Sequence, residues 1–113
     1  MFGSRGFGGN KETSRIIEGE EVLGFRRLEI VGHARTQMKI RNVSLADVLR
    51  TLRNPDEKGL GIQPAGRERV RWHKTARLAI DVVFERLADR IRVIAVISVT
   101  RRMVQRRQDN GHA

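Results

Sequence analysis

The spacing of apolar residues changes once along this chain, at Asn54–Pro55, and that change limits the fold more than any other feature. Before it, apolar side chains recur at i, i+3, i+4 and i+7, as on one face of a helix, at Leu45, Val48, Leu49 and Leu52. After it, between Val70 and Phe84, apolar and polar residues alternate, as in half-buried strands. Helices followed by strands predict an α+β domain.

The helical part is predicted to be a hairpin of two helices. A short first helix carries Ala34 and Met38 on one face. The second is expected to begin at Ser44, a candidate N-cap with Asp47 three residues later as a weak capping box. It ends before Pro55, because the residue that precedes a proline is pushed out of the α region.

The later part is predicted to form a small sheet. Strands are expected at 69–74, 78–85 and 91–99, and the last, apolar almost throughout, suits a central strand covered on both faces. The short loop RLADR at 86–90 makes the last two strands antiparallel. Residues 16–31 fit no period well, although RRLEIV within them could add a strand. The expected fold is therefore a helical hairpin packed on a three- to four-stranded antiparallel sheet.

Alternation also assigns side chains to faces of this sheet. If Ile80 and Val82 pack on the helices, the residues between them point the other way. The open face would carry Arg69, Arg71, His73, Arg77, Asp81, Glu85, Arg92, Ser98 and Thr100. Because these groups are positive, titratable or hydrogen-bonding, we expect the functional site on that face.

The chain of 113 residues has room for one domain. We expect a flexible glycine-rich lead-in at 1–15, a folded domain at 16–102 and a polar basic tail at 103–113. The absence of cysteine excludes thiol catalysis, disulfides and thiolate zinc sites. No apolar run approaches the roughly 18 residues of a membrane helix, so we expect a cytoplasmic protein or a module delivered as part of a longer secreted chain.

The formal net charge is +10, and all of it lies from His33 onward, because five basic and five acidic residues cancel in 1–32. Such an excess attracts polyanions and favours phosphate contacts, which predicts a nucleic-acid or acidic protein partner. The alternative is an arginine-rich surface that serves solubility alone.

Three segments resemble one family of small bacterial domains. HARTQMKIRNVS matches its signature, in which His-Ala is followed by two residues, Arg-Met, two residues, Arg, Gly, Ile or Val, and Ser. LRNP resembles the end of the family's second helix, and IRVIAVISVTRR resembles its final strand. The chain departs from the pattern at Gln37, Asn42 and Thr100, and it contains no tyrosine. The family is similar to BrnT and RelE-type ribonuclease toxins and to effector domains of polymorphic toxins, so the resemblance implies a RelE- or barnase-like architecture.

The resemblance also implies metal-independent cleavage of RNA, such as tRNA or ribosome-bound mRNA, by attack of the 2′-hydroxyl on the adjacent phosphate. We expect His33 and His73 to share the proton transfers, without metal or cofactor. The cations expected to hold phosphate are Arg41, Arg71, Lys74, Arg101 and Arg102. An acidic antitoxin or immunity protein is the expected partner.

Each of these residues also has a purely structural interpretation. His33 could cap its own helix, His73 could sit on a wet surface, and the cations could be solvated. Trp72 fits the core at least as well as a base-stacking site, and Asp81 fits a cross-strand ion pair with an arginine. A binding module without chemistry on the same fold is therefore the alternative function.

Overall fold

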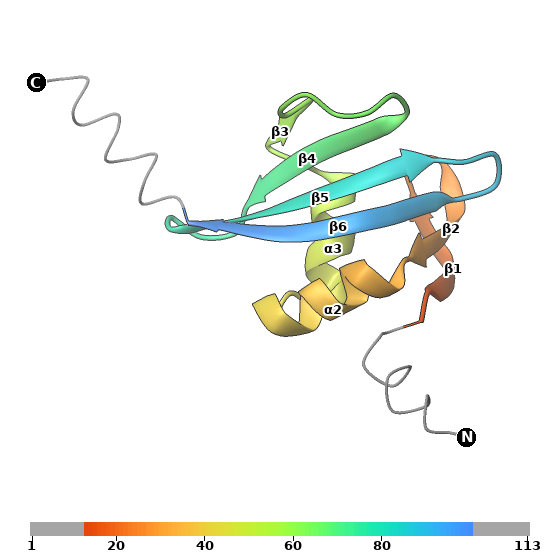
Figure 1. Cartoon of the computed structure of the whole chain (residues 1–113), viewed down its shortest axis with the longest axis horizontal. Helices are drawn as coiled ribbons and strands as arrows, with labels where there is room; N and C mark the ends of the chain where they lie inside the picture. Colours follow the sequence, from red (N-terminus) through yellow and green to blue (C-terminus); the bar gives the residue numbers. More distant parts are fainter. Residues whose placement is uncertain (1–12, 101–113) are drawn as a thin grey trace, which may run out of the picture.

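A computed structural model describes residues 13–100, which form a six-stranded sheet with two helices on one face (Figure 1). The elements are β1 (Arg15–Val22), β2 (Phe25–Ile30), α2 (Gly32–Arg41), α3 (Leu45–Arg53), β3 (Glu57–Lys58), β4 (Arg67–His73), β5 (Leu78–Arg86) and β6 (Ile91–Thr100). The expected α+β class and the pair of consecutive helices are confirmed.

The sheet is larger than predicted and is mixed rather than antiparallel. Its strand order is β1-β2-β6-β5-β4-β3, and β2 pairs with β6 in parallel at Leu28–Ile30 and Ile91–Val93. All other neighbours are antiparallel, including the predicted β5–β6 pair. The expectation of three to four strands was wrong, because β1 and the two-residue β3 were not predicted, whereas the possible strand in RRLEIV is β2. The parallel β2–β6 pairing joins segments about sixty residues apart and leaves no local pattern.

The irregular pattern of residues 16–31 has a backbone cause. β1 and β2 form a hairpin whose register shifts between Glu18 and Val22, and Gly19 lies there with a φ of 93°. A shift of this kind interrupts the two-residue alternation on which sequence-based strand prediction depends. β1 is therefore a strand that its side-chain pattern conceals.

Both helix boundaries of the second helix follow the prediction. The Ser44 hydroxyl accepts the Asp47 backbone N–H, and the Asp47 carboxylate accepts the Ser44 N–H, which completes the capping box. α3 ends at Arg53, before Asn54 and Pro55. α2 ends at Asn42, which adopts the left-handed conformation with a φ of 55° that asparagine tolerates.

The core lies between the helices and one face of the sheet. The stripe of α3 buries Val48, Leu49 and Leu52 against Ile80, Val82 and Phe84 of β5. α2 contributes Ala34 and runs along β6. Trp72 packs at the margin of this core, as its structural interpretation required, and the Arg50 guanidinium lies over its ring at 4.9 Å from the centroid.

A β-bulge in β6 changes which side chains face the helices. Val83 pairs with Ala95 but Phe84 pairs with Val93, so Ile94 is an extra residue and the alternation is inverted beyond it. Ser98 and Thr100 therefore do not lie on the open face as expected; Ser98 pairs with Ile80 on the helix side. The list of open-face positions in β6 instead reads Arg92, Ala95, Ile97 and Val99.

β6 is central, as predicted, but it is not buried on both faces. Ala95, Ile97 and Val99 keep partial exposure on the open face. β1 begins at Arg15, close to the expected start of the domain, while most of the expected lead-in and all of the expected tail lie outside the described residues. Neither helix of residues 13–100 is long and apolar enough to cross a membrane.

Candidate nucleic-acid interface

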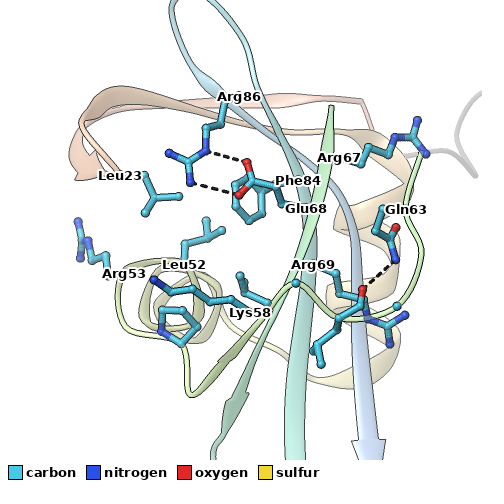
Figure 2. A pocket seen from close by; sticks show the side chains of 15 residues that line it. Leu23, Leu52, Arg53, Lys58, Gln63, Arg67, Glu68, Arg69, Phe84 and Arg86 are labelled. Carbon is cyan, nitrogen blue, oxygen red and sulfur yellow. Dashed lines mark hydrogen bonds and ion pairs between the residues drawn. The ribbon is translucent and has the colours of Figure 1, made fainter. Parts of the chain in front are cut away.

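Two parts of the surface concentrate cations around features that could hold a ligand. One is the open face of the sheet, formed by β4, β5, β6 and β2. The other is the helix side, where a pocket of about 290 Å³ opens beside the end of α3 (Figure 2).

Arginines do line the open face, at every second position of β4. Arg67, Arg69 and Arg71 follow one another on that side, and His73 completes the row. Each arginine is opposed by a carboxylate of β5: Arg67 contacts Glu85 at 3.2 Å, and Arg69 and Arg71 both contact Asp81 at 2.6 Å. This row is therefore a set of cross-strand ion pairs, which confirms the structural interpretation of Asp81.

Asp81 is the most buried member of this face, with none of its side chain exposed. Arg71 donates to both of its oxygens, at 2.6 and 2.9 Å, and Arg69 donates to Oδ2 at 2.8 Å. The hydrogen bond with Asp81 raises the pKa of Arg71, against the opposing effect of its partial burial. Arg71 uses two of its five N–H donors on this carboxylate, which also compensates its charge and so weakens its attraction for a phosphate.

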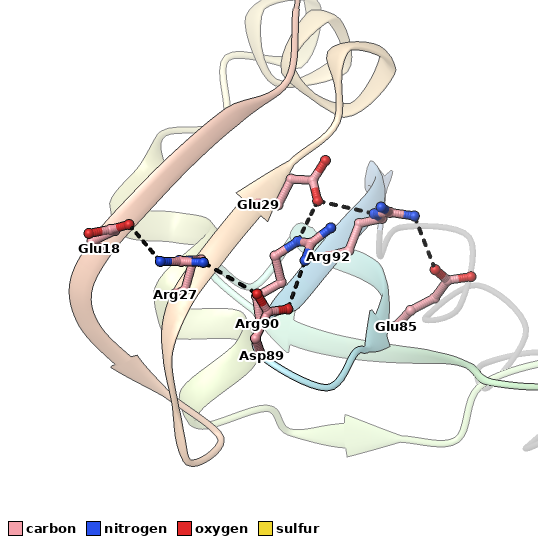
Figure 3. A network of polar contacts seen from close by, with 7 residues as sticks. All are labelled: Glu18, Arg27, Glu29, Glu85, Asp89, Arg90 and Arg92. Carbon is pink, nitrogen blue, oxygen red and sulfur yellow. Dashed lines mark hydrogen bonds and ion pairs between the residues drawn. The ribbon is translucent and has the colours of Figure 1, made fainter.

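The other half of the open face is compensated in the same way. Figure 3 shows a chain of contacts that runs from Glu18 of β1 through Arg27, Asp89, Arg90, Glu29 and Arg92 to Glu85. The hydrogen bond from Arg90 holds the pKa of Glu29 below its usual value; burial opposes this effect, and Arg92 reinforces it. The expected strongly positive sheet face is thus close to electrically balanced.

Among the described residues, the helical layer has the largest charge excess, with +4 in residues 32–54 against +3 in residues 55–100. Residues 32–54 carry five basic side chains and one acidic one, whereas residues 13–31 carry three basic and four acidic. The single acid, Asp47, is mostly buried and bonded to Lys74 at 3.0 Å. We call the outer side of α2 and α3 the helical surface; its cations are Arg35, Lys39, Arg41, Arg50 and Arg53.

Two of these cations stand well placed for a ligand. Arg41 is exposed at the end of α2 and has no ion pair within residues 13–100. Arg50 is exposed on the outer side of α3, and its only recorded partners in that range are uncharged: the Trp72 ring and the Asn54 carbonyl. Arg53 is tied to Glu20 at 2.7 Å. Arg50 and Arg53 were not predicted from the sequence. The near absence of acidic residues between 32 and 54 could have indicated that few acidic partners lie close in sequence to the cations of this segment.

The two histidines proposed for proton transfer are far apart. His33 is the second residue of α2, next to Val31, whose N–H bonds Val93 at the start of β6. His73 pairs with Ala79, which pairs with Val99 near the end of β6. Val93 and Val99 are six residues apart along β6, which corresponds to about 20 Å at about 3.3 Å per residue. The structure therefore does not bring the two imidazoles to one phosphate.

His73 is also engaged by carboxylates. Its Nε2 lies 2.6 Å from Glu57 of β3, and its backbone N–H donates to Asp56 at 2.8 Å. Its Nδ1 is buried and has no hydrogen-bond partner among the described residues. Nε2 of His73 is thus occupied by Glu57 and Nδ1 is buried, whereas His33 is exposed on the first turn of α2.

The remaining predicted residues divide into paired, exposed and undescribed groups. Arg71 is bound to Asp81, and Lys74 is bound to Asp47 at the N-terminus of α3. Arg41 is exposed, three residues before the Ser44 cap. Arg101 and Arg102 lie outside the described residues. Within residues 13–100, no cluster of three or more His, Cys, Asp or Glu side chains could hold a metal ion.

Comparisons of the chain with protein-family models, with curated proteins and with solved structures find no match in any of the three.

Proposed function

We propose that this protein is a nucleic-acid-binding module, with RNA as the polymer, and that it uses the helical surface to contact phosphates. The observation that carries the proposal is the separation of charge. The arginines of the open sheet face have carboxylate partners, while Arg41 and Arg50 of the helical surface have none within residues 13–100. Cations without acidic partners exchange their counterions for phosphates at the lowest cost.

Binding should be measured with a fluorescently labelled single-stranded RNA between about 50 and 200 mM salt. The logarithm of the association constant is expected to fall linearly with the logarithm of salt concentration, with a slope of several units. A flat response would contradict the proposal and leave the charge as a solubilising surface. A DNA of the same sequence tests whether the polymer is read through its sugar.

Variants then locate the interface. Arg41→Gln and Arg50→Gln should each weaken binding and lower the salt slope by about one, as expected for one lost phosphate contact. Arg77→Gln is the matched control, because Arg77 is exposed in the β4–β5 turn. If Arg77→Gln weakens binding as much as the helical variants do, attraction is general and the helical surface is not the interface.

A ribonuclease toxin domain of RelE- or barnase-like architecture is the second candidate. His33 favours it, because this imidazole is exposed and has no recorded hydrogen bond within residues 13–100. Cleavage of RNA by the purified protein, with a loss of about 10² to 10⁴ in rate for His33→Ala and little loss for His73→Ala, would support it. If RNA stays intact after incubation and bacteria tolerate expression of the protein, the ribonuclease is excluded and the binding module is supported.

An acidic antitoxin or immunity protein would fit the same helical surface, since complementary charge speeds and orients association. Competition between such a protein and RNA for the wild-type chain, lost in the Arg41→Gln, Arg50→Gln double variant, is the expected result. Simultaneous binding of both would place the protein partner elsewhere.

A further inference from the structure

The pocket beside the end of α3 has an apolar interior. Leu52 of α3, Val70 of β4 and Phe84 of β5 are buried and form its floor. Leu23, in the β1–β2 turn, forms one wall and remains partly exposed. Figure 2 shows Leu23, Leu52 and Phe84 around the opening, with Leu23 and Leu52 facing the ring of Phe84. Water over such surfaces is displaced favourably by an apolar group.

The opposite wall combines backbone with the side chains of Leu60 and Gln63. It consists of the segment that links β3 to β4, where Gly59 and Gly61 both have a φ of 66°. The segment is held at its start by the Leu60 N–H, which donates to the Arg69 carbonyl at 3.3 Å, and at its end by the Arg67 N–H, which donates to the Pro64 carbonyl at 3.0 Å. The pocket is therefore formed before any ligand arrives, which limits the ordering cost of binding.

Three cations surround the mouth of this pocket. Arg86 is neutralised by a two-point contact with Glu68, at 2.7 and 3.2 Å, and Arg53 is paired with Glu20. Lys58 is exposed, and its side-chain ammonium has no hydrogen bond or ion pair within residues 13–100. Its side chain extends across the opening in the direction of Arg53 in Figure 2.

The other charged residues that line the pocket have partners of opposite charge. Arg67 and Arg69 line the pocket but are bonded to Glu85 and Asp81 on the open sheet face. Glu68 is the only acid among the lining residues, and it is held by Arg86. One positive charge, that of Lys58, is left without a partner beside an apolar interior.

We propose that this pocket binds a small organic anion with an apolar body. The body lies on Leu52 and Phe84, and the anionic group meets the Lys58 ammonium at the mouth in a charge-assisted hydrogen bond. The volume of about 290 Å³ is at the lower end of the range for ligand sites, which suits a molecule of one or two rings. This site is separate from the phosphate contacts proposed for Arg41 and Arg50.

The test uses three probes of one shape and different charge: 2-naphthoate, 2-naphthalenemethanol and 2-naphthylmethylamine. Each is titrated into the full chain and followed by amide chemical shifts. The anion is expected to bind at least about tenfold more tightly than the alcohol, and the amine more weakly still. Shifts should concentrate at Leu23, Leu52, residues 58–61 and Phe84. Equal binding of anion and alcohol, or shifts outside this set, would overturn the proposal.

Two variants and one control separate the charge from the cavity. Lys58→Gln should weaken 2-naphthoate about tenfold and leave the alcohol unchanged, while Arg77→Gln should change neither. Leu23→Asn should weaken both, because it removes the wall yet suits the positive φ of 53° at that position. Melting curves check that all three variants fold. Full affinity for 2-naphthoate in Lys58→Gln would contradict the assignment.

Discussion

At the residue scale, the carboxylates that are most buried and most fully bonded stabilise the fold. Asp81 combines complete burial with two arginine partners, and Asp47 combines a helix cap with an ion pair to Lys74. A carboxylate that is buried and fully bonded is costly to remove, because its partners lose the charge that compensates them.

Asp81→Asn should therefore destabilise the protein substantially. Breaking a buried ion pair costs about 3 to 5 kcal/mol, and the lower end is expected here since Arg69 and Arg71 keep some contact with water. Chemical denaturation measures the loss. Glu68→Gln is the control, because the Glu68–Arg86 pair is exposed and should contribute less than about 1 kcal/mol. Similar losses in the two variants would contradict the distinction.

Asp47 predicts how stability depends on pH. Burial opposes its ionisation, but the bonds from the Ser44 N–H and from Lys74 outweigh burial, so the pKa of Asp47 is lowered. A lowered folded pKa gives stability that is present above the unfolded value, about 3.9, and is lost as the pH falls through the folded pKa.

Asp47→Asn should consequently be less stable at pH 7, and its unfolding free energy should decline less than that of the wild type between about pH 5 and pH 2. Urea denaturation across this range checks both statements. Parallel curves for the two proteins would mean that Asp47 does not contribute to acid unfolding.

At the element scale, α2 takes the place of a neighbouring strand along the part of β6 that β2 does not cover. β2 covers the edge of β6 only as far as Val93, and α2 continues along the strand beyond that point. There the Gln37 side chain of α2 accepts the backbone N–H of Val96 at 2.8 Å. An arginine, which the toxin-like signature has at this position, offers no acceptor.

Gln37→Leu should cost about 1 to 3 kcal/mol, because it leaves the buried Val96 N–H without a partner while keeping the volume. Gln37→Glu keeps an acceptor at the same position and should recover most of the loss. Thermal or chemical unfolding of the three proteins makes the comparison. If Gln37→Leu is as stable as the wild type, water rather than Gln37 can accept the hydrogen bond of the Val96 N–H.

At the scale of the whole molecule, pairing is uneven across the sheet. β5 has β4 and β6 on its two sides along most of its length, whereas β1 has a neighbour on one side only among the described residues, and β3 spans two residues. Amide hydrogen exchange should be slowest in β5 and the facing half of β6 and fastest in β1 and β3. Exchange in β1 as slow as that in β5 would indicate that another segment or a partner covers its outer edge.

The local elements of this protein were set by the sequence itself. The apolar stripe of α3, its capping box, its end before Pro55 and the β5–β6 hairpin all follow from side chains within a few residues of one another. Interactions of that range are encoded in spacing, so they can be predicted from one chain. The assignment of Asp81 to a cross-strand pair succeeded for the same reason.

The tertiary structure alone decided where the cations act. Sequence alternation placed a basic site on the sheet and indicated the ion pair of Asp81, but it could not reveal that Glu85 and Glu29 also neutralise this face from neighbouring strands. Nor could it show that His33 and His73 lie at different ends of β6, because their separation depends on the parallel β2–β6 pairing and on strand register. Charge adds along a sequence, whereas the field at a surface depends on which opposite charges the fold brings within a few ångströms.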